Sequence, residues 1–220
     1  MDPDALSDAQ KALRAQLLAT EHWSLLASRS TTQNEVLTRI AIFLTLVSAG
    51  LVTVGVLGQA SNFEGWFTAA ALGVLLLLSV LGFITTVRVY LTGSEDLMYV
   101  LAMNRLRGAY LDLAPDLAPY LLMSPNDDEA GAGRTYDYFT TRGFTHVIGS
   151  SMVLCATVDA VVSALFVGSL LATLALPMPA AVAIGCAVAL LVLTGWMSIG
   201  YRTYRRSLEL HVPMRRTPPA

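Results

Sequence analysis

One acidic residue, Asp159, lies in the middle of the apolar stretch CATVDAVVSALF at residues 155–166. A carboxyl group inside a membrane span is rare, and its usual roles are to hold a proton, bind a cation or hydrogen-bond a neighbouring helix. Counted from Val147, where we expect the span to begin, Asp159 is about 18 Å deep at 1.5 Å per residue. That depth is near the middle of a hydrocarbon core about 30 Å thick.

Polar side chains recur around Asp159 at four-residue steps. Ser151, Cys155, Asp159 and Ser163 lie on one face of a helix, because residues four apart share a face. The same depth on the first apolar segment is near Thr53, which we expect to be the hydrogen-bond partner of Asp159. No lysine or arginine lies at this depth in any apolar segment.

Small residues form a second line beside the polar one. Five small residues recur every four positions in the third segment, and two more have the same spacing in the fourth. The five are Ala156, Ala160, Ala164, Gly168 and Ala172, and the two are Gly185 and Ala189. Small residues let two helix backbones approach closely. We therefore expect Asp159 to point into a helix contact and not toward lipid.

Three roles for Asp159 remain open on the sequence. It is a neutral packing residue, bonded within the chain or to its copy in a homo-oligomer; or it handles protons or a cation; or it lies in a crevice that water reaches. A second charged residue at the same depth would favour transport, and the sequence has none there.

Four apolar segments of about the length that spans a bilayer must position these residues. They run from Ile40 to about Leu57, from Trp66 to Val87, from about Val147 to Leu174, and from about Met178 to Tyr201. The chain is 55% hydrophobic and only 14% charged, against about 25% charged in soluble domains. The sequence therefore predicts an all-α membrane protein of four transmembrane helices arranged as two hairpins, that is, a four-helix bundle.

The basic residues predict one orientation. All fourteen lysines and arginines lie before the first segment, between the second and third, or after the fourth. The two remaining loops, GQASNFEG and ALP, contain none. Because basic loops stay in the cytoplasm, we expect both termini and the central loop there. Arginine outnumbers lysine 13 to 1 and alanine is abundant, a usage typical of GC-rich genomes, so we expect a bacterial plasma membrane.

Five regions follow from this topology: a cytoplasmic N-terminal helix at 1–39, a hairpin at 40–87, a cytoplasmic helical linker at 88–146, a hairpin at 147–201 and a basic tail at 202–220. The first helix has two possible starts, Asp2 with Pro3 or a capping box of Ser7 and Gln10. Ser94 is the expected cap of a helix in the linker, and Pro115 is expected to end it.

Other candidate residues have a simple structural interpretation beside a functional one. Oxygen ligands at 126–129 (NDDE) suit a divalent cation but lack the spacing of a calcium loop, so a solvated linker is expected. His22 is expected to pack at a helix surface, and Cys155 and Cys186 to fill apolar space. Arginines of the tail set the orientation, and anionic lipid is a further possible partner.

The sequence carries none of the common enzyme signatures. It has no phosphate-binding glycine loop, no HExxH and no nucleophile elbow, and its three histidines are scattered. We expect no enzyme activity, cofactor or metal. The net charge of −2 gives no basic excess for nucleic acid.

Two stretches carry a resemblance to a known family. EHWSLLASRSTTQNEVLTRIAIFLTLVSAGLV and MNRLRGAYLDLAPDLAPY resemble the signature stretches of a family of uncharacterised actinobacterial four-span integral membrane proteins. The resemblance covers most of the first 125 residues and implies a bacterial plasma-membrane protein without an assigned activity. A cytoplasmic helix before a two-helix hairpin is also similar in architecture to SLATT-type membrane effectors, from which the second hairpin departs.

Together these features predict a non-catalytic integral membrane protein whose third span organises a bundle or a homo-oligomer. The alternative is a small oligomeric ion or proton channel or transporter, including a pore-forming effector, that uses Asp159. The lipid bilayer is the one partner that the sequence identifies; a small-molecule or ion substrate is not specified by it.

Overall fold

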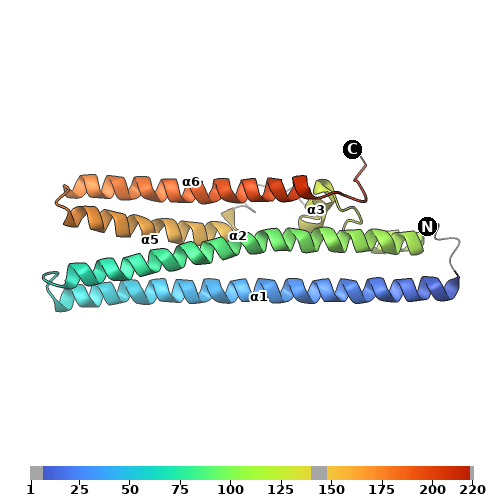
Figure 1. The fold of residues 1–220 in the computed structure, drawn as a ribbon, viewed down its shortest axis with the longest axis horizontal. Helices are drawn as coiled ribbons and strands as arrows, with labels where there is room; N and C mark the ends of the chain where they lie inside the picture. Colours follow the sequence, from blue (N-terminus) through green and yellow to red (C-terminus); the bar gives the residue numbers. More distant parts are fainter. Residues whose placement is uncertain (1–6, 140–147, 219–220) are drawn as a thin grey trace. The chain divides into compact units, whose positions relative to one another are not determined.

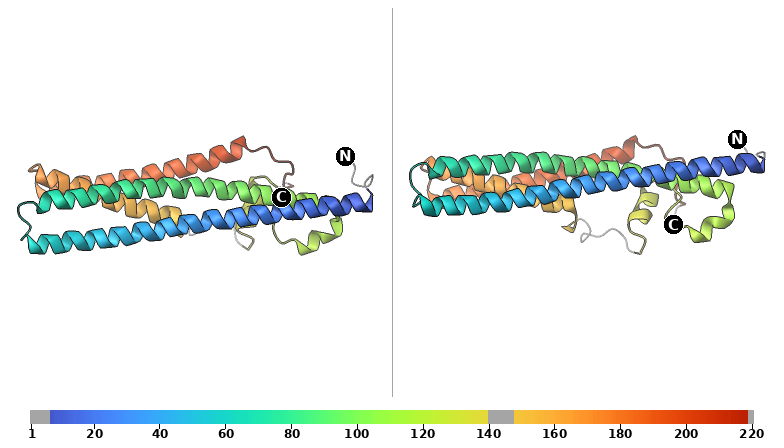
Figure 2. Two further views of the ribbon diagram at one scale, coloured as in Figure 1. Left: turned by 60° about the horizontal axis from the view of Figure 1, so that its bottom comes forward. Right: turned by 90° about the horizontal axis from the view of Figure 1, so that it is seen from below.

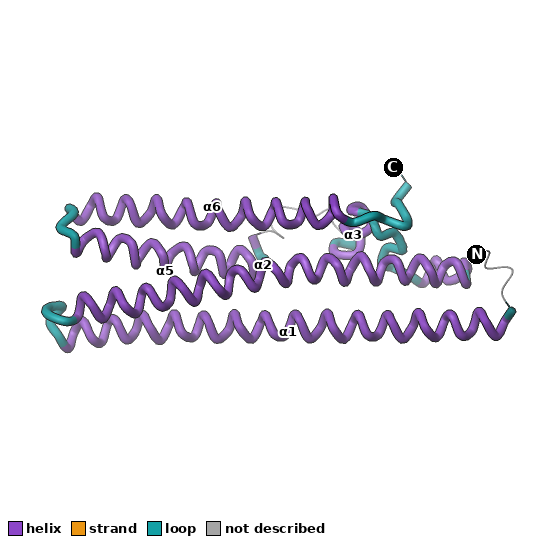
Figure 3. The backbone as a smooth tube through the Cα atoms, viewed as in Figure 1, coloured by secondary structure: helices purple, strands orange, loops and turns teal. Residues whose placement is uncertain are grey.

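The computed structural model describes residues 7–139 and 148–218. All secondary-structure elements in these residues are helices, which confirms the all-α class (Figures 1 and 3). The four long helices are α1 (Asp8–Ala60), α2 (Phe67–Leu113), α5 (Ser151–Thr173) and α6 (Met178–Leu210). Two shorter ones are the 3-10 helix η2 (Pro115–Tyr120) and α3 (Glu129–Tyr136).

The first two long helices continue well beyond a membrane span. α1 has 53 residues and α2 has 47, whereas about 20 cross a bilayer. The expected helix start at Ser94 is therefore wrong, because Ser94 is inside α2. Neither helix contains a proline, and each glycine inside a helix costs only about 1 kcal/mol, so the separate glycines of α1 and α2 do not end these helices.

The helix ends follow local sequence signals. Ser7 N–H donates to Gln10 Oε1 at 2.9 Å and Gln10 N–H donates to Ser7 Oγ at 3.3 Å, which confirms the capping box as the start of α1. The expected break at Pro115 is also confirmed, since α2 ends at Leu113. Asp2, Pro3 and Val147 lie outside the described residues.

Within residues 7–139 and 148–218, four helices are long and apolar enough to cross a membrane. In the most apolar stretch of each, at most 28% of the residues are buried inside the protein. Large side chains such as Leu77, Leu190 and Leu191 are exposed instead. Contiguous exposed apolar surface of this kind marks contact with a membrane or a partner. The four predicted spans are confirmed, and they fit a multi-pass integral membrane protein.

By its internal contacts the chain divides into two compact units, which we describe separately. Unit 1 contains the described residues of 1–34, 92–144 and 203–220, and unit 2 those of 35–91 and 145–202. Thus η2 and α3 belong to unit 1, α5 belongs to unit 2, and the other three long helices contribute to both.

Unit 2 consists of two helical hairpins packed together. The turn between α1 and α2 and the turn between α5 and α6 lie at the same end of this unit, at the left of Figure 1 and of both views in Figure 2. One core cluster joins Phe43 of α1 to Leu78 of α2 and Val162 of α5. A second joins Val89 of α2 to Cys155 of α5. All of these side chains are apolar, so the core forms by close packing.

Unit 1 has a small core of its own. Leu97, Val100 and Leu101 of α2 pack with Ala132 of α3, and Tyr204 of α6 lies against them. This core holds the segment that follows η2 against α2 and the last turns of α6. Polar contacts of that segment are described below.

Candidate functional site

Asp159 is enclosed in unit 2, with only 2% of its surface exposed. Its Oδ2 accepts a hydrogen bond from Trp196 Nε1 of α6 at 2.9 Å. Trp196 is itself buried, so this is a hydrogen bond between α5 and α6 in the interior of the unit.

The other carboxylate oxygen of Asp159 faces α2 at a glycine. A Cβ placed on Gly82 would be 2.5 Å from Asp159 Oδ1 and 3.0 Å from the ring of Phe43. Only glycine leaves room for the carboxylate and the aromatic ring together. Asp159 therefore lies where α1, α2, α5 and α6 meet.

The prediction that Thr53 is the hydrogen-bond partner of Asp159 is wrong. Thr53 is exposed, and its hydroxyl donates to the carbonyl oxygen of Ala49 in its own helix at 2.8 Å. Of the predicted polar line, Cys155 is fully buried, Ser163 is half-buried and Ser151 is exposed. Counting depth along a span selects a level in the bilayer, but it does not say which way a side chain points around the helix.

Sequence reasoning misses Trp196, because an aromatic residue near the end of a span also suits an interfacial belt. A signal for its role is present in the sequence. Side chains on a helix tilt toward its N-terminus, so the long indole of Trp196 reaches back about one turn from its own Cα. This tilt places the indole closer than the Trp196 Cα to the level of Asp159 on the antiparallel helix α5.

Three buried polar atoms in unit 2 have no hydrogen-bond partner among the described residues: Asp159 Oδ1, Thr86 Oγ1 and Tyr90 OH. Gly82, Thr86 and Tyr90 follow one another at four-residue steps, so they share one face of α2. The Tyr90 ring stacks on Trp196 with centroids 5.5 Å apart and an interplanar angle of 11°. Unpartnered polar groups in a core are uncommon, because each one gives up hydrogen bonds that it makes in water.

The line of small residues lies between α5 and α6. Ala156 and Ala160 are buried. Farther along, a Cβ on Gly185 would be 3.1 Å from the Ala164 carbonyl oxygen, and one on Gly168 would be 4.0 Å from the Gly185 Cα. The two backbones thus approach closely within one chain. Ala189, at the end of the predicted line, is half-buried.

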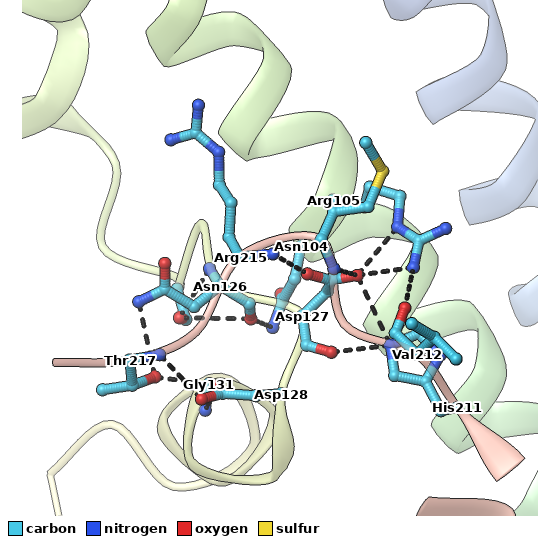
Figure 4. Close-up of polar contacts among 12 residues, drawn as sticks. Asn104, Arg105, Asn126, Asp127, Asp128, Gly131, His211, Val212, Arg215 and Thr217 are labelled. Atoms are coloured by element: carbon cyan, nitrogen blue, oxygen red, sulfur yellow. Dashed lines mark hydrogen bonds and ion pairs between the residues drawn. The ribbon is translucent and has the colours of Figure 1, made fainter. Parts of the chain in front are cut away.

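A second polar cluster, in unit 1, is built around Asp127, whose side chain is fully buried (Figure 4). Its Oδ1 accepts from the backbone N–H of Arg215 at 2.8 Å, and its Oδ2 accepts from the Met214 N–H at 3.1 Å and from Arg105 Nε at 2.8 Å. The His211 ring contacts the Asp127 carbonyl oxygen at 2.7 Å. One carboxylate therefore holds the tail that follows α6.

Asp128 performs two tasks next to it. Its Oδ1 accepts from the Gly131 N–H at 2.8 Å, which caps α3, and its Oδ2 accepts from the Thr217 N–H at 2.7 Å. Asn126 adds its carbonyl oxygen, which accepts from Asn104 Nδ2 at 2.9 Å. These contacts connect α2, the start of α3 and the tail (Figure 4).

These hydrogen bonds change the acidity of both carboxyl groups. Burial by itself would raise the pKa of Asp127, but the N–H groups of Arg215 and Met214 and the Arg105 guanidinium outweigh it and lower that pKa. Burial would likewise raise the pKa of Asp128, but hydrogen bonds donated by Thr217 and Gly131 outweigh burial and lower that pKa. Both groups are therefore anions at neutral pH.

The expectation of a solvated linker at 126–129 is wrong for Asp127. Hydrogen-bond donors surround its carboxylate, and a cation ligand needs the same oxygen lone pairs. Among the described residues, no group of three His, Cys, Asp or Glu side chains is placed to hold a metal ion. The cluster is a structural connection between distant parts of unit 1.

The two clusters give unit 2 a buried carboxyl group among apolar helices and unit 1 a buried carboxylate that holds a tail. Neither arrangement contains a nucleophile activated by a base, among the residues that the structure describes. In comparisons with known proteins, no protein-family model, curated protein or solved structure matches this chain.

Proposed function

We propose that the chain is a non-catalytic integral membrane protein of the bacterial plasma membrane. In this proposal unit 2 is a self-contained bundle in the bilayer, and unit 1 is a folded cytoplasmic module that it anchors. The distribution of the basic residues supports the orientation, since eleven of the fourteen belong to unit 1 and the other three, Arg39, Arg88 and Arg202, lie just outside the predicted apolar segments of unit 2.

The observation that carries the proposal is the bond from Trp196 to Asp159. It uses the intramembrane carboxyl group to connect two helices of the same chain, next to the close α5–α6 backbone contact. Because that contact is made within one chain, the small residues do not need a second copy to be buried. We therefore favour a monomeric bundle over a homo-oligomer.

Substitutions at Asp159 test this role through stability in a detergent or bilayer unfolding assay. Asp159→Asn keeps an acceptor for Trp196 at nearly the same shape and is expected to stay close to the parent. Asp159→Leu leaves the indole N–H unpartnered and is expected to lower the free energy of unfolding by about 1–2 kcal/mol, the usual size of such bonds between membrane helices. Thr157→Leu, on an exposed position of α5, is the matched control and should be neutral.

A second function, proton or cation movement, has one observation in its favour. Asp159 Oδ1, Thr86 Oγ1 and Tyr90 OH are buried without partners among the described residues, as they would be along a path for protons and water. Purified protein in proteoliposomes under a pH or ion gradient separates the two functions. We expect no flux above that of empty vesicles. A flux seen in the parent and lost in a folded Asp159→Asn variant would reverse our choice.

A further inference from the structure

Arg107, in the part of α2 that belongs to unit 1, is a half-buried cation without a carboxylate partner among the described residues. Its Nη1 donates to Asn104 Oδ1 at 2.7 Å, which is a bond to a neutral amide. The same amide oxygen accepts from Thr135 Oγ1 at 2.9 Å, and Asn104 is fully buried. The guanidinium is thus held in one direction while its charge is not neutralised.

The pair formed by Arg29, which lies close enough to affect the charge of Arg107, and Asp96 does not supply the missing negative charge. Arg29 donates to both oxygens of Asp96, at 2.6 and 3.2 Å. Asp96 also accepts from Gln33 Nε2 at 2.8 Å and from Tyr136 OH at 2.7 Å. Four hydrogen bonds are about the full accepting capacity of a carboxylate. Asp96 is therefore engaged by partners other than Arg107.

The pKa directions of the neighbouring groups follow mainly from burial, with a smaller contribution from positive charge. Burial lowers the pKa of Arg107, and the positive charge of Arg29 lowers it further. Burial also lowers the pKa of His22, and the charge of Arg107 adds to that effect. An arginine keeps its proton even so, whereas His22 is neutral at pH 7.

The aromatic rings of His22 and Tyr110 lie near the Arg107 guanidinium. Their rings stack with centroids 6.0 Å apart and an interplanar angle of 25°. The His22 Nδ1 is buried and has no hydrogen-bond partner among the described residues. A neutral His22 ring donates to an anion from Nδ1 in the tautomer that carries the proton there, and the Tyr110 hydroxyl is a second neutral donor.

From these contacts we infer that unit 1 has a binding site for a phosphate group, with Arg107 as its principal cation and His22 as a neutral contact. A guanidinium presents paired N–H groups whose geometry matches phosphate oxygens. A bound phosphate would supply the counter-ion that Arg107 lacks. The inference goes beyond the proposed function and does not depend on what unit 2 does. A soluble phosphate compound and a lipid with a phosphomonoester headgroup share this chemistry.

The test uses the full chain in nanodiscs of phosphatidylcholine, titrated with inorganic phosphate against potassium chloride at equal ionic strength. We expect saturable binding by calorimetry and a rise in melting temperature for the parent. Arg107→Gln should weaken binding at least tenfold, and Arg107→Lys, which keeps the charge but loses the fork, should weaken it less. Arg14→Gln, which removes an exposed charge from α1, is the matched control and should bind like the parent.

The melting temperature without phosphate gives a second, independent result. Because Arg107→Gln removes a half-buried charge that has no counter-ion, the variant should melt no lower than the parent in chloride alone. Loss of binding in a variant of parental stability cannot be ascribed to misfolding. If Arg107→Gln melts much lower than the parent in chloride, Arg107 has an internal counter-ion and the inference is wrong.

A lipid arm identifies the source of the phosphate. In discs that contain phosphatidic acid, a stabilisation that depends on Arg107 and appears without soluble phosphate would assign the site to a lipid headgroup. A stabilisation by inorganic phosphate in neutral discs would assign it to a soluble compound. Equal binding by the parent and Arg107→Gln in both arms, or no binding in either, would overturn the inference.

Discussion

Two buried aspartates show how the surroundings decide what a carboxyl group does. Asp159 has one donor, the indole of Trp196, and apolar helices around it. Asp127 has backbone N–H groups and a guanidinium directed at it. The first arrangement suits a helix contact in a bilayer. The second holds a carboxylate as an anion and ties the chain to it.

The tail connection in unit 1 should depend on the charge of Asp127. Asp127→Asn replaces one acceptor oxygen by an amide that opposes an N–H donor, and it is expected to lower the free energy of unfolding of unit 1 by about 2–4 kcal/mol. Asp116→Asn removes the same charge from an exposed position in η2 and should be neutral. Thermal unfolding followed by circular dichroism measures both.

The pH dependence has a definite sign. Because the folded-state pKa of Asp127 is below its usual range, its contribution is complete above about pH 4, the value for the unfolded chain, and disappears as pH falls through the folded pKa. The difference in melting temperature between the parent and Asp127→Asn should therefore be constant near neutrality and shrink below about pH 4. A difference unchanged down to about pH 2 would contradict the assignment.

Among the elements, the contact of α5 with α6 depends on residues without side chains. The backbone carbonyl of Ala164 lies close to the position that a Cβ on Gly185 would occupy. Elsewhere on α6, a Cβ on Gly195 would meet nothing within 4 Å. A side chain added at Gly185 would therefore meet the backbone of α5, whereas one added at Gly195 would not meet a neighbouring atom.

This difference is testable with a matched pair of substitutions. Gly185→Leu must separate the two helices and is expected to destabilise the bundle by about 1–3 kcal/mol, the usual result of overpacking. Gly195→Leu projects into open space and should change stability by less than about 0.5 kcal/mol. Unfolding in SDS of both variants gives the comparison. Equal effects at the two positions would show that the close contact does not contribute to stability.

For the whole molecule, the two units differ in their charge, although both expose large apolar side chains. Unit 2 contains 6 of the 30 charged residues of the sequence, whereas unit 1 contains 24 and buries a network of charges and backbone groups that holds the tail. A bilayer favours helices with few charges, and water favours the charged unit. This contrast is the physical basis for the proposed division into membrane and cytoplasmic parts.

Cysteine labelling on intact cells tests the proposed orientation. In a background without Cys155 and Cys186, Glu64→Cys lies in the turn between α1 and α2, and Glu129→Cys lies at the start of α3; both positions are exposed. A membrane-impermeant maleimide should label Glu64→Cys in intact cells and Glu129→Cys only after permeabilisation. The opposite pattern would place unit 1 outside the cell.

The sequence by itself determined the number of spans and the helical class, because apolar length and the absence of charge are local properties that a bilayer imposes. It also determined the helix end at Pro115 and included the capping box at Ser7 as one of two possible helix starts, because the capping and breaking groups are within three residues of the boundary. The spans and the helix ends both depend on residues that are close together in the sequence.

Only the tertiary structure decided the partners of the two buried aspartates. Trp196 is 37 residues from Asp159, and Arg215 is 88 residues from Asp127. Depth counting selects a level in the bilayer but not a direction around a helix, so it selected Thr53 wrongly. A run such as NDDE is polar by composition, and its burial depends on a tail that returns to it from the far end of the chain. Such contacts are set by the packing of whole helices, which no local pattern specifies.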